Sequence, residues 1–434
     1  MTERDEEAAT VRQVSARLLP FLLGLYVFAY LDRANVGIAA LQMNADLSFG
    51  AATFGFGGGI FFVGYALFEI PSNLVLVRVG ARRWLARIAI TWGLITCAML
   101  FVRTPAQFYA ARFMLGVAEA GLFPGVIYYL SHWFPESHRA RALAGFAVAV
   151  PLAQVLGGPL GGALLGLRGA AGLGGWQWLF LVEGLPPVVL GCLALFWLTE
   201  RPAEARWLPP ARRAWLTERI AREARAVGGE GTAPLRALAN PLAWALAAPY
   251  FAYYTISLTY VLWTPTIVRE SLGTSDAVTG LVVGAIALIG AVAYPFAGML
   301  SDRWGERCYV AALGLACGAA GCAGVAVLAH SPLRFAALVG CALMNAFFMP
   351  SFWCLPTRFL RGPSAAAAIA LINAVGSSGG FFGPSVVGFF RALGGGDTGA
   401  FYALAALALL GCAACLGLRR LKTFRPGIVA SPAA

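Results

Sequence analysis

The chain has 434 residues, of which 59% are hydrophobic and only 12% are charged. A soluble domain carries about 25% charged residues, so this composition excludes an ordinary soluble globular protein and indicates an integral membrane protein. The net charge of +12 could indicate a nucleic-acid partner, but its distribution along the chain gives it another explanation.

Twelve apolar blocks follow one another, each close to the roughly 20 residues that a membrane-spanning helix needs. Six begin near residues 18, 53, 84, 106, 141 and 177, and six begin near residues 241, 277, 308, 332, 364 and 399. An acidic segment, residues 2–7, precedes the first block. We therefore interpret residues 18–41 as an uncleaved first span and not as a signal peptide.

One long polar connection, residues 199–240, divides the chain. Within it, Trp207, Trp215 and the mixed polar and apolar run at 216–222 predict an amphipathic helix at the cytoplasmic surface of the membrane. The expected organisation is a tail at 1–17, a six-helix bundle at 18–198, this cytoplasmic loop at 199–240, a six-helix bundle at 241–418 and a tail at 419–434.

The basic residues lie mostly on one side of the predicted spans. The two termini and alternate connections hold 25 Arg and Lys residues, whereas the remaining connections hold five. Cytoplasmic connections carry the excess of positive charge, so both termini are expected in the cytoplasm. Topology and anionic lipid thereby explain the net charge, and no nucleic-acid partner is expected.

Two short patterns recur at one constant offset of 225 residues. Residues 78–82 match residues 303–307, and Gly158–Pro159 matches Gly383–Pro384. Parallel repeats of this kind predict a binding site between two halves near the membrane midplane and transport by alternating access. The repeat aligns Arg78, Gly80 and Arg82 of the first half with Arg303, Gly305 and Arg307 of the second, and Asp302 directly precedes the second copy.

Ionisable residues inside a membrane span are costly and are functional candidates. Asp32 and Arg33 lie in the first span, and Arg112 and Glu119 lie in the fourth. Arg112 and Glu119 are seven residues apart, which places them on one helix face and about 10 Å apart along the axis. An arginine fork binds carboxylates bidentately, so Arg33 and Arg112 predict an anionic substrate. Glu69, near the cytoplasmic end of the second span, fits a gating or packing role.

Binding of an anion to Arg112 would allow Glu119 or Asp32 to take up a proton more readily. By reciprocity, protonation would favour binding of the anion, which is the basis of anion–proton symport. The alternative interpretation is structural, with Asp32–Arg33 and Arg112–Glu119 as internal ion pairs that fix helix packing.

Several motifs carry a family resemblance. The segment from Gly298 to Arg307 is similar to the loop signature of the major facilitator superfamily, although Val77 replaces the acidic residue in the first-half copy. This similarity implies a gating role for the loop residues of both halves, Asp302, Arg303, Gly305, Arg307, Arg78, Gly80 and Arg82. The runs at 30–35, 68–73 and 112–121 resemble those of the anion:cation symporter family, which includes bacterial transporters of galactonate, tartrate, phthalate and hydroxyphenylacetate, sialin and vesicular glutamate carriers.

This resemblance implies an all-α membrane fold with 12 transmembrane helices in two pseudo-symmetric six-helix bundles. It further implies that Arg33 and Arg112 engage a substrate carboxylate and that Asp32 and Glu119 carry protons. Tyr30, Tyr65 and Asn373 would line the cavity, although helix–helix hydrogen bonding is an equal alternative for such polar residues. Gln154 and Asn345 are weaker candidates of the same kind.

The predicted function is therefore import of a small organic anion with protons across a bacterial inner membrane. Export or exchange of anions is the nearest alternative, and a membrane-embedded enzyme or sensor is a more distant one. No catalytic cluster, metal-ligand spacing or cofactor motif is visible, and Cys412 and Cys415 lie in an apolar span without a nearby histidine. Because the predicted site lies inside one chain, a monomer is sufficient.

Overall fold

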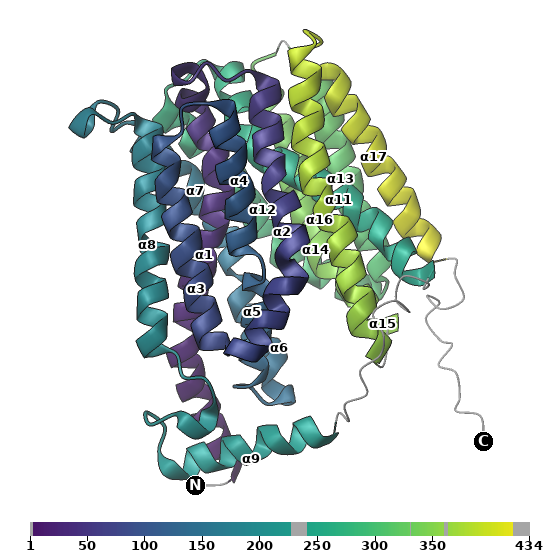
Figure 1. Ribbon diagram of the computed structural model, residues 1–434. Helices are drawn as coiled ribbons and strands as arrows, with labels where there is room; N and C mark the ends of the chain where they lie inside the picture. Colours follow the sequence, from purple (N-terminus) through teal and green to yellow (C-terminus); the bar gives the residue numbers. More distant parts are fainter. Residues whose placement is uncertain (1–2, 227–240, 330, 360–362, 420–434) are drawn as a thin grey trace. The chain divides into compact units, whose positions relative to one another are not determined.

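The computed structural model describes residues 3–226, 241–329, 331–359 and 363–419, and the regular structure of these residues is helical (Figure 1). The long helices, in chain order, are α1 (Glu3–Asp46), α2 (Ala51–Val79), α3 (Ala81–Ala98), α4 (Pro105–Glu119), α7 (Ala149–Leu165), α8 (Gly175–Trp197), α9 (Pro210–Ala226), α11 (Pro241–Leu272), α12 (Asp276–Trp304), α13 (Arg307–Val327), α14 (Arg334–Phe352), α16 (Pro363–Ala392) and α17 (Thr398–Leu418). Shorter helices are α5 (Leu122–Ser131), α6 (Glu136–Ala147) and α15 (Cys354–Phe359), with 3₁₀ turns at Met99–Phe101, Ala170–Gly172 and Pro202–Glu204.

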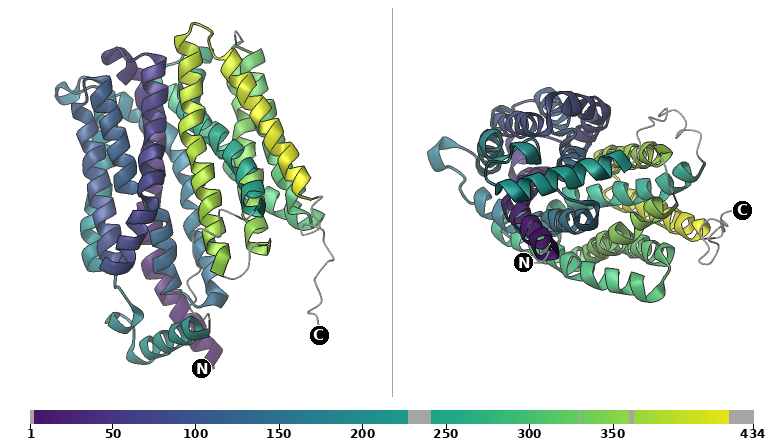
Figure 2. Two further views of the ribbon diagram at one scale, coloured as in Figure 1. Left: turned by 45° about the vertical axis from the view of Figure 1, so that its right-hand side comes forward. Right: turned by 90° about the horizontal axis from the view of Figure 1, so that it is seen from below.

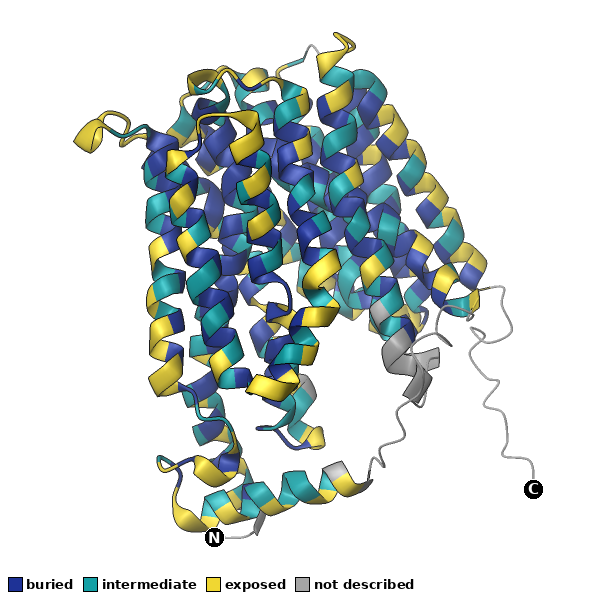
Figure 3. Ribbon diagram, viewed as in Figure 1, coloured by how far each residue is buried: buried dark blue, intermediate teal, exposed yellow. Residues whose placement is uncertain are grey.

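The helices have the length and surface of membrane spans. Ten helical stretches among the described residues are long and apolar enough to cross a bilayer. Exposed positions recur along the helices (Figure 3). On α8 they include apolar residues, because Leu185, Val189 and Phe196 lie on one face of the helix and are 50%, 55% and 86% exposed. Two further long helices, α11 with 32 residues and α16 with 30 residues, correspond to the remaining two predicted spans. Each of the twelve predicted spans therefore has a helix in the described part of the chain. The predicted all-α membrane fold is confirmed.

The described helices belong to two compact units. Unit 1 comprises residues 1–36, 63–157 and 164–229, and unit 2 comprises residues 37–62, 158–163 and 230–434. The boundary between the units runs through α1, α2 and α7, because each of these helices contributes residues to both.

In unit 1, glycines allow α3 and α8 to pack backbone against backbone. A Cβ atom on Gly93 would lie 2.6 Å from the Gly184 carbonyl oxygen, and one on Gly191 would lie 2.9 Å from the Ala86 carbonyl oxygen. Small residues permit this close approach of membrane helices. The contact fixes the position of α8 relative to α3 around residue 184.

Helix α9 is the predicted amphipathic helix of the central connection. It lies crosswise at the end of the unit 1 helices (Figures 1 and 2). Its Glu223 accepts a hydrogen bond of 2.9 Å from the Glu136 backbone N–H. Trp207, just before the helix, stacks on Trp133 with ring centroids 5.5 Å apart. Residues 227–240 of the predicted loop and 420–434 of the predicted tail lie outside the described residues.

The repeated motifs have the same local roles in both copies. A Cβ atom on Gly158 of α7 would lie 2.4 Å from the Gly280 carbonyl oxygen, and one on Gly383 of α16 would lie 2.2 Å from the Thr255 carbonyl oxygen. Gly80 and Gly305 both have positive φ, +98° and +64°, at the turn after a long helix. Only glycine adopts such values without strain. The sequence repeat is therefore also a repeat of local structure.

Candidate functional site

Unit 1 brings together the four ionisable residues of the first and fourth spans, which we call the ion cluster: Asp32, Arg33, Arg112 and Glu119. Asp32, Arg112 and Glu119 are 1%, 2% and 0% exposed. The Arg33 Nη2 atom donates a hydrogen bond of 2.5 Å to the Oε1 atom of Glu119. Glu119 is therefore paired with an arginine of α1, and Arg112 of its own helix exerts a further electrostatic attraction on it.

The position of Glu119 follows from a break in the fourth span. Helix α4 ends at Glu119, and Gly121 adopts a left-handed conformation with φ of +88° before α5 begins. Ser72 of α2 donates a hydrogen bond of 2.6 Å to the carbonyl of Ala120, which the break leaves outside the helical ladder. The run at 68–73 therefore supports the break beside Glu119. A negative charge at the carboxyl end of a helix is unfavourable, which makes the contact with Arg33 important.

Two tyrosines hold the Arg33 guanidinium. Its Cζ atom lies 5.0 Å from the ring centroid of Tyr30 and 5.3 Å from that of Tyr65. Such cation–π contacts stabilise a partly desolvated arginine. Two predicted cavity residues thus contact a predicted substrate-binding arginine. The third, Asn373, lies half-buried on α16 of unit 2.

Asp32 has polar neighbours of its own. The Thr96 Oγ1 atom of α3 donates to Asp32 Oδ1 at 2.7 Å, and the Asn35 amide donates to the same oxygen at 3.4 Å. Arg112 exerts its electrostatic attraction on both Asp32 and Glu119. The cluster thus contains two guanidinium groups and two carboxyl groups, and ionisation of all four leaves it neutral.

A fifth ionisable residue, Glu183, was not among the predicted candidates. It lies on α8, is 2% exposed, and its carboxyl group interacts with Asn35 and Asp32. The sequence carries the signal, because Glu183 is the single acidic or basic residue between Gly175 and Trp197.

The second-half loop motif forms a local ion pair. Arg307, at the start of α13, donates hydrogen bonds of 2.7 Å to both Asp302 and Ser301 at the end of α12. Gly305 makes the turn between these helices, and Arg303 is exposed. The predicted residues of this motif thus meet at one helix junction.

In the first half, a distant residue replaces the missing acidic side chain. Val77 occupies the position of the acid and is exposed, as is Arg78. Instead, Glu200 accepts hydrogen bonds from the backbone N–H groups of Ala81 at 2.6 Å and Arg82 at 3.0 Å. A carboxylate at the amino end of α3 satisfies free N–H donors and complements the helix dipole.

We expect Glu200→Ala to lower the free energy of unfolding by about 1 kcal/mol, because it removes the cap of α3. Thermal unfolding of the purified protein in detergent measures the change. Glu204→Ala provides the matched control, since Glu204 is an exposed acid of the same connection. Equal destabilisation by the two substitutions would contradict a capping role for Glu200.

Asn345 of unit 2, a weaker candidate for the binding site, takes part in hydrogen bonds between helices. It accepts hydrogen bonds of 2.7 Å from Tyr253 and from Ser257, which fits the helix–helix interpretation.

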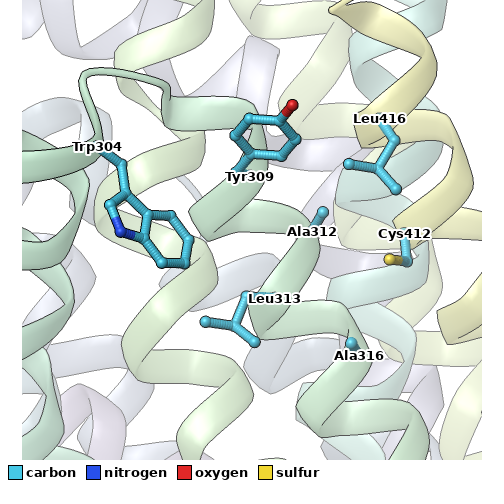
Figure 4. Close-up of a pocket in the computed structure, with 7 residues that line it drawn as sticks. All are labelled: Trp304, Tyr309, Ala312, Leu313, Ala316, Cys412 and Leu416. Carbon is cyan, nitrogen blue, oxygen red and sulfur yellow. The ribbon is translucent and has the colours of Figure 1, made fainter.

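Unit 2 also has an apolar pocket of about 610 Å³ (Figure 4). Its lining residues are Trp304, Tyr309, Ala312, Leu313, Ala316, Cys412 and Leu416. Since this lining has no charged group, the pocket offers no counter-charge to an anion.

Comparison with known proteins places the chain in a family. The sequence profile of the Major Facilitator Superfamily matches residues 22–384 and 250–429. A protein of Agrobacterium vitis named "Putative tartrate transporter" is 43% identical, with 98% of each chain covered. The "Quinolone resistance transporter" of Acinetobacter baumannii is 41% identical, with 94% of each covered.

Solved structures agree on the fold. The crystal structure of a bacterial homologue of the human lysosomal transporter Spinster has a TM-score of 0.77 and 18% identity, and covers 97% of this chain and 99% of its own. The predicted resemblance and fold are confirmed, as is the expectation of a transporter and not an enzyme. The chain is a multi-pass membrane protein that belongs to the Major Facilitator Superfamily.

Proposed function

We propose that this protein is a secondary active transporter that imports a small organic anion together with protons by alternating access. The observation that carries the proposal is the buried contact between Arg33 and Glu119. An arginine is the preferred ligand of a carboxylate, so a substrate anion would compete with Glu119 for Arg33. Glu119 would then lose its counter-ion at the end of α4 and take up a proton.

The same exchange accounts for coupling in both directions. Protonated Glu119 no longer attracts Arg33, and the guanidinium becomes available to the anion. Proton and substrate thereby favour each other, as thermodynamic linkage requires. Asp32 would carry a proton in the same way beside Arg112. Tyr30 and Tyr65 would position Arg33, and Asn373 would bind the substrate through its amide.

Two arginines suit a substrate with one or two carboxylates. The naming of the Agrobacterium vitis relative favours a hydroxy-dicarboxylate such as tartrate over a sugar acid or an aromatic acid. One chain contains every residue that the proposal uses, so a monomer is sufficient. The charge distribution supports cytoplasmic termini in a bacterial inner membrane.

The loop motifs would act in the conformational change. Arg307 and Asp302 pair at the α12–α13 junction, where Gly305 makes the turn and Arg303 lies beside them. In the first half, Glu200 binds the backbone N–H groups of Ala81 and Arg82 just after the turn at Gly80, and Arg78 precedes this turn. Breaking and remaking such contacts would bias the two states of an alternating-access cycle.

Export is a second candidate function. It is favoured by the relative from Acinetobacter baumannii, whose name assigns it to quinolone resistance. An exporter would move its substrate out of the cell in exchange for entering protons, so the direction of coupled flux distinguishes the candidates.

Uptake by proteoliposomes tests the proposal. Purified protein is reconstituted, and uptake of radiolabelled tartrate, galactonate and benzoate is measured with the outside acidic and with equal pH on both sides. We expect one of these anions to accumulate several-fold more with the gradient than without it. Uptake that is indifferent to the gradient would contradict proton coupling, and quinolone movement against the proton flux would favour export.

A further inference from the structure

We propose that Glu183 and Asp32 act as one proton-holding pair, linked through Asn35, in which the two carboxyl groups share a single proton. This inference rests on the proposed function and extends its proton-binding part to a helix, α8, that none of the predicted site residues occupies.

Glu183 is held in an enclosed environment. Its side chain is 2% exposed, and its Oε2 atom receives no hydrogen bond from any described residue. The neighbouring Gly184 lies against α3, where a Cβ atom would come within 2.7 Å of the Cys97 sulfur. An ionised carboxylate with an unsatisfied oxygen and no counter-ion is strongly disfavoured in such surroundings.

Among the described residues, no cation acts electrostatically on Glu183. Its electrostatic neighbour is Asp32 of α1, and its polar neighbour is Asn35 of the same helix. On α3, Cys97 faces the neighbouring Gly184, and Thr96 donates to Asp32; both are neutral groups. Arg112 of α4 attracts Asp32 and Glu119. Because Arg33 and Arg112 already balance Asp32 and Glu119, a third ionised carboxyl group would leave unit 1 with an uncompensated buried charge.

Asn35 provides the connection. It is 3% exposed and donates to Asp32 Oδ1, while Asp32 Oδ2 and Asn35 Oδ1 receive no hydrogen bond from described residues. An amide can donate to a carboxylate and accept from a protonated carboxyl group, so Asn35 can connect the two side chains whichever of them carries the proton. Two carboxyl groups that interact in this way titrate as a pair, and the pair retains its proton to higher pH than one carboxyl alone.

The Glu183→Gln substitution tests the shared proton through the pH profile of uptake. Glutamine is neutral and of similar size, so Asp32 becomes a lone carboxyl beside Arg112. Uptake that requires a bound proton falls as pH rises, and we expect the midpoint of this fall to move about one pH unit toward acid. An unchanged midpoint would overturn the proposal and assign Glu183 a permanently neutral structural role.

Infrared titration of the protein in lipid gives a readout that does not require transport. A protonated-carboxyl band that titrates in the wild type and is altered by both Glu183→Gln and Asp32→Asn is expected. A band that responds to only one substitution, or a wild-type band that does not titrate, would overturn the pair. The wild-type measurement remains decisive if a variant does not fold. If the wild type shows no gradient-driven uptake, the proposed function is contradicted, but the infrared test of the Glu183–Asp32 pair still applies.

Discussion

Glu119→Gln is expected to abolish stimulation of uptake by a pH gradient while leaving exchange of substrate across the membrane active. Glutamine resembles protonated Glu119, so the substitution removes the 2.5 Å ion pair and leaves Arg33 available at every pH. A hydrogen bond to a charged group contributes about 1.5–3 kcal/mol, which corresponds to roughly 10- to 100-fold tighter substrate binding at alkaline pH. Binding is measured by calorimetry on purified protein, and exchange by counterflow in proteoliposomes.

Glu218→Gln is the control for this experiment, because Glu218 lies on α9 and pairs with Arg222 four residues later in the same helix. It is expected to retain the gradient stimulation and the pH dependence of the wild type. If Glu119→Gln also retained the gradient stimulation, Glu119 would be a structural partner of Arg33, and the proton would bind elsewhere.

The arrangement of the spans could be predicted because it depends on local properties of the sequence. Apolar length, interrupting polar residues and glycines at turns fix where each helix begins. The apolar block near residue 277 corresponds to α12, which begins at Asp276, and the block near 308 corresponds to α13, which begins at Arg307. The six-plus-six division at 199–240 stays a prediction, since the compact units divide α1, α2 and α7 instead.

The pairings inside the site could not be predicted, because they depend on how helices are rotated against one another. Spacing places Arg112 and Glu119 on one face of α4, but it does not reveal that Arg33 of α1 reaches Glu119. The cap of α3 by Glu200 joins residues 119 positions apart. Glu183, by contrast, could have been found from the sequence, since one acidic residue in an apolar span is itself the signal.

Arg112→Ala is expected to weaken substrate binding in every transport mode, by roughly 10- to 100-fold in affinity. The substitution also leaves the buried Asp32 carboxyl without its nearby cation, which costs about 3–5 kcal/mol when one partner of a buried pair is removed. Reduced uptake by this variant alone would therefore not separate binding from folding. Thermal unfolding must be measured beside substrate binding.

Two further variants separate these effects. Arg112→Lys keeps the positive charge beside Asp32 but replaces the planar fork with a single ammonium group, so we expect near-normal stability and at least tenfold weaker binding. In the double variant Arg112→Ala with Asp32→Asn, the uncompensated charge is removed, so stability should recover while binding stays weak. Recovery of binding together with stability would instead show that Arg112 serves only as the counter-ion of Asp32, and substrate recognition would then depend on Arg33 alone.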